Sequence, residues 1–205
     1  MSTKPRIFLL FFFIASLAGC SSISPPISDV KWQTHQAQLS QIKQFQLVGK
    51  LGYRSPEQRQ SLNFQWQTSP TGTQLRLTTF LGQTVLNLSI DEHGAQVQTR
   101  DDQRYRASSA QQLVQQLTGL DIPIELLQDW ILGLPSQADQ FELNSHNTLA
   151  WLDKTTEQQH WHVNYQQYRE YQWQGVMLPL PDKLTLSQET TSINLVISKW
   201  TLTHE

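Results

Sequence analysis

Apolar and polar residues alternate along most of the chain after residue 44, and this period of two is typical of strands with one buried face. Turn-forming residues separate the alternating segments, as in "SPTG" at 69–72 and "DEHG" at 91–94. We expect about eleven strands from twelve alternating segments. The segments that predict them are 45–54, 61–68, 73–80, 83–90, 95–100, 103–107, 140–144, 148–153, 160–168, 173–179, 183–188 and 192–202.

Three other segments have the wider spacing of an amphipathic helix. Residues 29–45 predict the first helix, whose apolar residues lie roughly on one face at Trp32, Leu39, Ile42 and Phe45. The other two helices are expected at 110–119 and 121–135. Their start and stop signals are Ser108 or Ser109 and Gly119 for the first, and Pro123, Gly133 and Pro135 for the second.

One turn departs from the expected polarity. Between two predicted strands, the chain places Phe80, Leu81 and Gly82. Gly82 suits a turn, whereas Leu81 would carry a large aliphatic side chain into solvent. Single exposed leucines are common on protein surfaces, so the pattern alone favours a chance apolar turn residue.

The first twenty residues predict a lipoprotein leader. Lys4 and Arg6 precede the apolar run "IFLLFFFIASL", as in a secretory signal peptide. This run of about eleven residues is shorter than the roughly 20 that span a membrane, so a retained anchor helix is the weaker alternative. "LAGC" at 17–20 resembles the lipobox of bacterial lipoproteins, in which the cysteine, here Cys20, carries the lipid. The other interpretation is an ordinary secreted protein with an incidental cysteine.

The residues after Cys20 suggest a location and a domain division. Ser21 and Ser22 follow it rather than Asp, which by analogy with bacterial lipoproteins favours the periplasmic face of the outer membrane. We divide the chain into a removed signal peptide (1–19), the lipidated cysteine with a flexible tether (20–28) and a single domain (29–205). The domain is predicted to be mainly β with α (α+β), a half-open antiparallel β-barrel whose concave side the helices cover.

Charge and cysteine content exclude several classes of protein. Residues 1–19 hold two of the 15 basic residues, Lys4 and Arg6, and none of the 17 acidic ones, so their removal changes the formal net charge from −2 to −4. No basic stripe for nucleic acid is visible, and no charge cluster marks a docking face. Cys20 is the only cysteine, which excludes a disulfide framework and a cysteine-based metal site.

Catalytic motifs are lacking, since the chain contains neither G-x-S-x-G nor HExxH. His160 and His162 lie two apart on a predicted strand, so both would face solvent if Trp161 faces inward. A metal pair there is the weaker alternative, because no third ligand is in view. Asp101 and Asp102 suit a turn better than an acid–base pair. We expect no enzyme activity, no cofactor and no metal.

Bulky apolar residues gather on one face of the predicted strands and on the helices. For any one of them a packed core is the simpler interpretation, but a curled sheet of this size can also enclose an apolar cavity. The pattern leaves both possibilities open. The candidate residues for a cavity wall are Leu47, Leu51, Phe64, Trp66, Leu86, Leu88, Leu113, Leu117, Leu127, Trp130, Ile131, Trp161, Val163 and Leu195, with Ile193 and Ile197 on the same face.

Several motifs along the chain occur together in a recognisable order. The sharpest is "IPIELLQDWILGLP" at 122–135, with its spacing of Trp130, Gly133 and Pro135, combined with Leu81–Gly82. Further segments, along essentially the whole mature chain, are "WQTHQAQLSQIKQFQLVGKLGY", "LTTFLGQTVLNL", "RYRASSAQQLVQQLTG" and Trp200. Together with the lipobox, these motifs resemble the LolB family of outer-membrane lipoprotein receptors.

The resemblance implies a receptor and chaperone of a Gram-negative bacterium that accepts acylated lipoproteins from the periplasmic carrier LolA and inserts them into the outer membrane without nucleotide hydrolysis. It also implies that an apolar cavity holds the acyl chains and that Phe80, Leu81 and Gly82 form a loop that presents Leu81 to membrane lipids. A monomer is expected. Two alternatives remain: a lipocalin-like carrier or sensor of free lipids, and a structural envelope lipoprotein with no accessible cavity.

Overall fold

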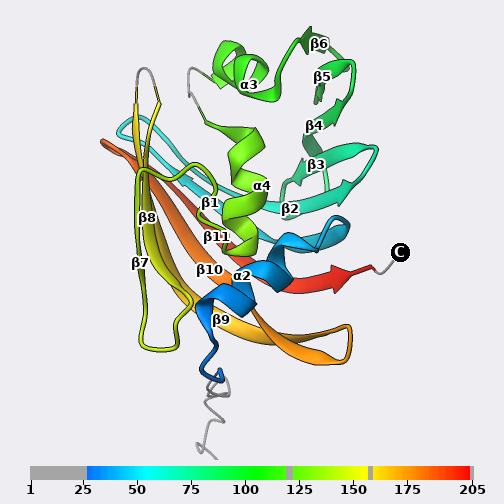
Figure 1. The fold of residues 1–205 in the computed structure, drawn as a ribbon. Coiled ribbons are helices and arrows are strands. Elements are labelled where there is room, and N and C mark those ends of the chain that lie inside the picture. Colours follow the sequence, from blue (N-terminus) through cyan, green and yellow to red (C-terminus); the bar gives the residue numbers. More distant parts are fainter. Residues whose placement is uncertain (1–26, 119–121, 157–158, 204–205) are drawn as a thin grey trace, which may run out of the picture.

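The computed structural model describes residues 27–118, 122–156 and 159–203. Within these residues, eleven strands form one sheet, and three helices accompany it (Figure 1). The helices are α2 (Trp32–Ser40), α3 (Ala110–Thr118) and α4 (Ile124–Leu132). The strands are β1 (Phe45–Arg54), β2 (Arg59–Ser69), β3 (Gly72–Thr78), β4 (Thr84–Asp91), β5 (Gly94–Thr99), β6 (Arg104–Ala107), β7 (Gln140–Leu143), β8 (Leu149–Thr155), β9 (His160–Trp173), β10 (Val176–Gln188) and β11 (Thr191–Leu202).

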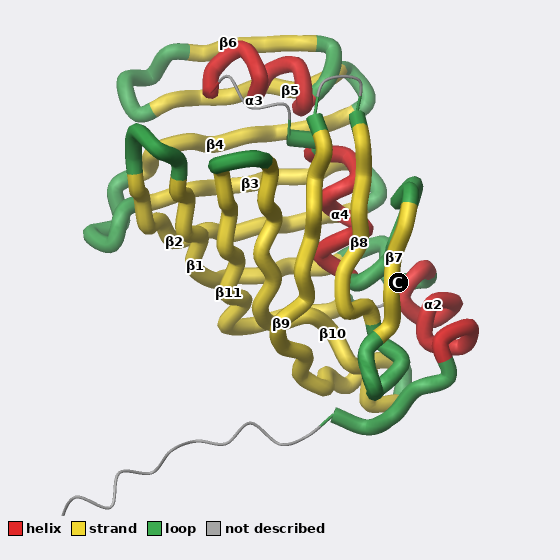
Figure 2. The backbone as a smooth tube through the Cα atoms, turned by 90° about the vertical axis from the view of Figure 1, so that its left-hand side faces the viewer, coloured by secondary structure: helices red, strands yellow, loops and turns green. Residues whose placement is uncertain are grey.

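The sheet is antiparallel throughout and open. Its strand order is β6-β5-β4-β3-β2-β1-β11-β10-β9-β8-β7, so β1 pairs with β11 and the two ends of the domain meet in the middle of the sheet (Figure 2). In the described part of the chain, β6 and β7 are the two edges and do not pair with each other. The predicted class, a mainly β protein with a half-open sheet, is therefore confirmed.

The sheet curves strongly, and α4 lies inside the curve (Figure 1). α3 contacts β5 and β6 near one edge, while α4 contacts α3 and β10. The alternation of the sequence decides which side chains face this interior. On β9, for example, Trp161, Val163 and Tyr165 are buried, whereas His160 and Asn164 are exposed on the opposite face.

The predicted extent of the first helix is wrong. α2 ends at Ser40, and a tight turn follows in which Ile42 N–H donates to the carbonyl of Leu39. Ile42 and Phe45 are buried as expected, but Phe45 already belongs to β1, where it pairs with Thr68 and Leu202. Sheet pairing on both sides of β1 therefore prevails over the helical spacing.

The two strands predicted at 173–179 and 183–188 are a single strand, β10. Gln174 and Gly175 form the hairpin turn before it, and both have a positive φ, 48° and 81°, as the tight turns of hairpins require. Pro179 and Pro181 cannot donate a backbone N–H to the sheet, yet the strand continues through them, with a register shift after Pro181.

The helices expected between the strands are present. Ser109 caps α3, since its Oγ accepts the N–H of Gln112 at 3.2 Å. Gly133 ends α4 in the left-handed conformation (φ 89°), and the N–H of Leu134 then reaches back to the carbonyl of Asp129. Gly119 lies outside the described residues. Each helix of the described residues is too short or too polar to cross a bilayer.

Candidate functional site

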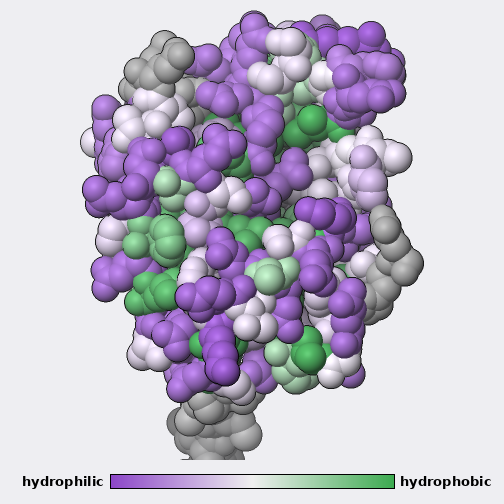
Figure 3. Space-filling model, in the orientation of Figure 1, coloured by the Kyte–Doolittle hydropathy of each residue, from purple (hydrophilic) through white to green (hydrophobic). Residues whose placement is uncertain are grey.

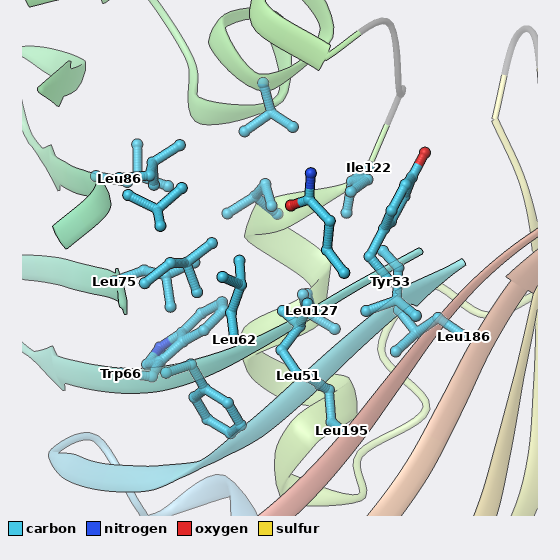
Figure 4. Close-up of a pocket in the computed structure, with 18 of the residues that line it drawn as sticks. Leu51, Tyr53, Leu62, Trp66, Leu75, Leu86, Ile122, Leu127, Leu186 and Leu195 are labelled. Carbon is cyan, nitrogen blue, oxygen red and sulfur yellow. The ribbon is translucent and has the colours of Figure 1, made fainter. Parts of the chain in front are cut away.

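An apolar cavity of about 390 Å³ lies between the inner face of the sheet and the helices. Figure 4 shows side chains from the strands, among them Leu51, Leu75 and Leu86, that surround a common space with Leu127 of α4. The lining residues are Leu51, Tyr53, Gln58, Gln60, Leu62, Phe64, Trp66, Leu75, Leu77, Val85, Leu86, Leu88, Val114, Leu117, Ile122, Ile124, Leu127, Ile131, Leu186, Ile193 and Leu195.

Strand register builds the wall of this cavity from rows of matching apolar residues. Trp66 lies opposite Leu75, which lies opposite Leu88 on the next strand. Two residues further along, Phe64, Leu77 and Leu86 form a second row in the same way. Because each row crosses β2, β3 and β4 on the inner face, these strands present a continuous apolar surface to the helices.

The cavity is not filled by the protein's own side chains. Several of the residues that line it, including Leu62, Leu75, Leu77 and Leu86, are only half-buried. Gln58 and Gln60 line it from the β1–β2 hairpin and are exposed, with the amide of Gln60 donating to Gln58 at 3.1 Å. These glutamines therefore mark a polar rim where the cavity reaches solvent.

A buried hydrogen bond holds the C-terminal half of α4 against the sheet, and a second hydrogen bond ties the helix to the loop that follows it. The Tyr165 hydroxyl donates to the carbonyl of Trp130 at 2.8 Å, and the Trp130 indole N–H donates to the carbonyl of Ser136 at 3.1 Å. Burial raises the pKa of Tyr165 well above its ordinary value, so this hydroxyl keeps its proton. Leu127 and Ile131, two of the three α4 side chains that line the cavity, thus project from a fixed support.

The structure divides the candidate wall residues into two groups. Those that line the cavity are Leu51, Phe64, Trp66, Leu86, Leu88, Leu117, Leu127, Ile131, Ile193 and Leu195. Those placed instead in the packed core are Leu47, Leu113, Trp130, Trp161, Val163 and Ile197. The physical reason is that alternation assigns a residue to a face of the sheet, but not to a position along that face. Trp161 and Val163, for example, lie on β9, a strand that contributes no side chain to the cavity wall.

Other lining residues were missed, although a signal for some of them exists. Leu62, Leu75 and Leu77 lie two residues from predicted wall positions or opposite them, so the same alternation places them on the wall. Tyr53 belongs to the wall by the same argument, since it lies two residues from Leu51 and opposite Ile193. Gln58 and Gln60 could not be found in this way, because polar side chains at a rim look like any exposed position. The remaining residues missed are Val85, Val114, Ile122, Ile124 and Leu186.

The β3–β4 loop holds its two large apolar residues in solvent. Phe80 is 85% exposed and Leu81 is 71% exposed, more than any other large hydrophobic residue of the described chain. The loop is closed by hydrogen bonds, since Thr79 N–H donates to the carbonyl of Gln83 and Gly82 N–H to the carbonyl of Thr79. Gly82 adopts a φ of 82°, which accounts for glycine at this position. The exposure is therefore built into a hydrogen-bonded turn.

Hydrophilic residues dominate the face of the molecule shown in Figure 3, where apolar residues form only small, separate patches.

His160 and His162 lie on the outer face of the sheet, as Trp161 is fully buried between them. A carboxylate that the sequence did not reveal joins them: Asp153 Oδ1 lies 2.7 Å from His162 Nδ1 and 3.5 Å from His160 Nε2. Across residues 27–118, 122–156 and 159–203, no set of three such side chains is arranged to hold a metal ion.

The remaining candidate residues from the sequence are Asp101, Asp102 and Cys20. Asp102 lies in the β5–β6 turn with a φ of 57°, and its carboxylate accepts the side-chain amide of Gln98. Asp101 and Asp102 thus serve the turn, as predicted. Cys20 lies outside the described residues, so its lipidation stays a prediction.

A curved, open antiparallel sheet that shelters an apolar hollow beneath short helices defines a class of proteins suited to binding apolar ligands. Two solved structures share the fold. One is a putative outer membrane lipoprotein-sorting protein domain from Vibrio parahaemolyticus, with a TM-score of 0.54, 8% identity and 83% and 89% of the two chains covered. The other is a DUF1329 family protein from Desulfovibrio piger, with a TM-score of 0.55, 8% identity and 82% and 89% coverage.

Sequence comparison gives the family. A family model described as "Outer membrane lipoprotein LolB" matches residues 43–200. The outer-membrane lipoprotein LolB of Vibrio cholerae is 59% identical over 91% of each chain, and that of Vibrio vulnificus is 53% identical over 95% of this chain and 96% of its own. The chain therefore belongs to the LolB family, and its location is the outer membrane of a Gram-negative bacterium, where a lipid anchors it.

Proposed function

We propose that this protein is the outer-membrane receptor that takes lipoproteins from a soluble, LolA-like carrier, holds their acyl chains in the cavity and releases them into the membrane. The observation that carries the proposal is an apolar cavity whose wall side chains are only partly buried, in a chain of the LolB family. A structural lipoprotein would have no need for an accessible apolar hollow. The cavity therefore counts against that alternative.

The energetics explain why a cavity is needed and why no nucleotide is. Each methylene kept out of water contributes roughly 0.8 kcal/mol, so the acyl chains of a lipoprotein exposed in the periplasm would cost tens of kcal/mol. An apolar cavity offsets most of this cost. Transfer then runs downhill if the cavity holds the chains more strongly than the carrier does and less strongly than the bilayer does.

The β3–β4 loop supplies contact with the membrane. Burying a leucine or phenylalanine side chain contributes on the order of 1.5–3 kcal/mol, and both Phe80 and Leu81 are free to do so. This is enough to orient the receptor at the membrane surface, but too little to anchor it alone. The anchor is the lipid on Cys20, as the sequence predicts.

A two-stage transfer experiment tests the proposal. The chain from residue 21 onward retains every described element, and it would be mixed with carrier-bound lipoprotein, first without and then with outer-membrane vesicles. We expect cargo to move to the receptor in the absence of membrane and into the vesicles when they are added. A chain that extracts free lipid but takes no lipoprotein from the carrier would be a lipid carrier, and the proposal would fail.

The Leu81→Glu variant tests the role of the loop. It should accept cargo as the unaltered chain does, because Leu81 lies outside the cavity wall, and insert that cargo into vesicles at least tenfold more slowly. Met177→Glu is a matched control, since Met177 is an exposed apolar residue (56%) on the β9–β10 hairpin. Equal insertion rates for Leu81→Glu and Met177→Glu would show that the β3–β4 loop has no special contact with the membrane.

A further inference from the structure

A groove that contains two cationic side chains lies on the outer face of the sheet, beside the exposed loop, and Val48 and Phe64 add apolar surface to it. Gly82 of the loop forms one wall, and outward-facing residues of β1, β2 and β3 form the floor. Two of the ten lining residues, Lys50 and Arg76, are cationic, and no lining residue is acidic. Asn63, Gln65 and Thr78 supply uncharged polar groups between them.

The groove is a product of local sheet geometry. The register between β1 and β11 shifts between Val48 and Gly49, which leaves Ser198 as an extra residue on β11. Gly49 permits the close approach of β11, because a Cβ atom there would lie 2.1 Å from the carbonyl oxygen of Val196. The side chain of Asn63 also donates to the carbonyl of Thr79 at 3.2 Å and so ties the loop to the groove floor.

The two cations of the groove are exposed and lack acidic partners. In the part of the chain that the structure describes, neither Lys50 nor Arg76 forms an ion pair with a carboxylate. Arg76 is oriented by Thr84 Oγ1, which accepts from its Nη2 at 2.9 Å. Asp102 lines the neighbouring depression on the other side of Arg76, where Gln98 donates to its carboxylate.

More positive charge lies on the same face. Lys50 lies opposite Val196 on β11, which in turn lies opposite Lys183 on β10, and Lys199 lies opposite Val48. These lysines likewise have no ion pair within the described residues. A chain with a net charge of −2 therefore gathers unpaired cations on one face, next to its most exposed apolar loop.

We propose that the groove of Lys50 and Arg76 binds the phosphate of an anionic lipid headgroup while Phe80 and Leu81 enter the acyl region beneath it. This inference rests on the membrane contact of the loop proposed above and names the surface that completes it. The apolar loop and the cationic groove adjoin, as the acyl and phosphate layers of a bilayer do. Together they set the orientation of the receptor on the membrane, because neither alone gives a defined tilt.

Vesicle binding by the chain from residue 21 onward tests the groove. The double variant Lys50→Gln/Arg76→Gln should bind vesicles that contain phosphatidylglycerol about thirtyfold more weakly than the unaltered chain, since each cation near an anionic membrane contributes about fivefold. Its binding to pure phosphatidylcholine vesicles and its acceptance of cargo in solution should be unchanged. A binding constant on phosphatidylglycerol equal to that of the unaltered chain would overturn the inference.

Two controls separate the groove from other causes. Lys31→Gln/Lys43→Gln removes the same charge from exposed lysines next to α2 and should bind normally, whereas an equal loss in both double variants would reduce the effect to net charge and overturn the inference. Inorganic phosphate at constant ionic strength should not displace the chain, and displacement would make the groove a site for free phosphate rather than a membrane contact.

The Leu81→Glu variant keeps the two proposals distinguishable. If it loses binding to both kinds of vesicle while Lys50→Gln/Arg76→Gln binds normally, the loop contact stands and the headgroup groove fails. If Leu81→Glu binds every vesicle as the unaltered chain does, the loop contact itself fails.

Discussion

The variant Gly49→Ala tests how closely β11 approaches β1 in the sheet. A Cβ atom at this position would lie 2.1 Å from the carbonyl oxygen of Val196, 2.9 Å from the Phe64 ring and 3.0 Å from the Cα of Ile197. Two of these three neighbours belong to the β11 backbone, so β1 and β11 would have to separate to admit even one methyl group. Overpacking costs typically 1–3 kcal/mol, and we place Gly49→Ala at about 3 kcal/mol because backbone must move.

The measurement is the free energy of unfolding in urea, with Gly52→Ala as the matched control on the same strand. At Gly52 the nearest atom to a new Cβ is the Asn194 Cβ at 3.8 Å, an ordinary contact. This variant should be neutral, or more stable by about 0.5 kcal/mol, because alanine restricts the unfolded chain. If both substitutions shift the free energy by the same amount, the close approach of β11 to Gly49 is not real.

Two further predictions concern buried polar groups. Burial lowers the pKa of His35 from 6.5 to about 4. Between these pH values the unfolded chain binds a proton at His35 and the folded chain does not, so the free energy of unfolding falls as the pH falls. Between pH 7 and 5 the unaltered chain should lose about 1–2 kcal/mol more than His35→Leu in urea unfolding, and parallel pH profiles would refute this. Tyr165→Phe should cost about 0.5–1.5 kcal/mol, because it removes one of the two donors to the Trp130 carbonyl and leaves only the N–H of Gly133. Tyr53→Phe at the cavity wall should leave the unfolding free energy unchanged.

Much of the fold follows from local patterns in the sequence. Alternation located the strands and the face that each one buries, because a strand's side chains point to opposite sides by geometry. Gly133 and Ser109 marked helix ends, since an αL stop and a side-chain cap are local properties of the backbone. Leu81 was also recognisable from the sequence, because turns usually carry polar residues and this one carries a large aliphatic side chain.

Secondary-structure predictions from local patterns were wrong where strands distant in the sequence pair with the segment in question. The helix predicted to reach Phe45 gives way to a strand because β2 and β11 pair with that residue on both sides. In the same way, Pro179 and Pro181 do not divide β10, whose ends are held by pairing with β9 and β11.

Alternation along the chain is enough to show that one face of the sheet is apolar, whereas the positions where that face is packed solid or hollow are visible only in the folded protein. Leu86 and Val163 have the same pattern, yet one lines the cavity and the other lies in the core. Similarly, Lys50 and Arg76 are isolated cations in the sequence and share a groove only in the folded sheet. The reason is that periodicity sets the direction of a side chain, whereas its neighbours are set by strand register and helix placement over long sequence distances.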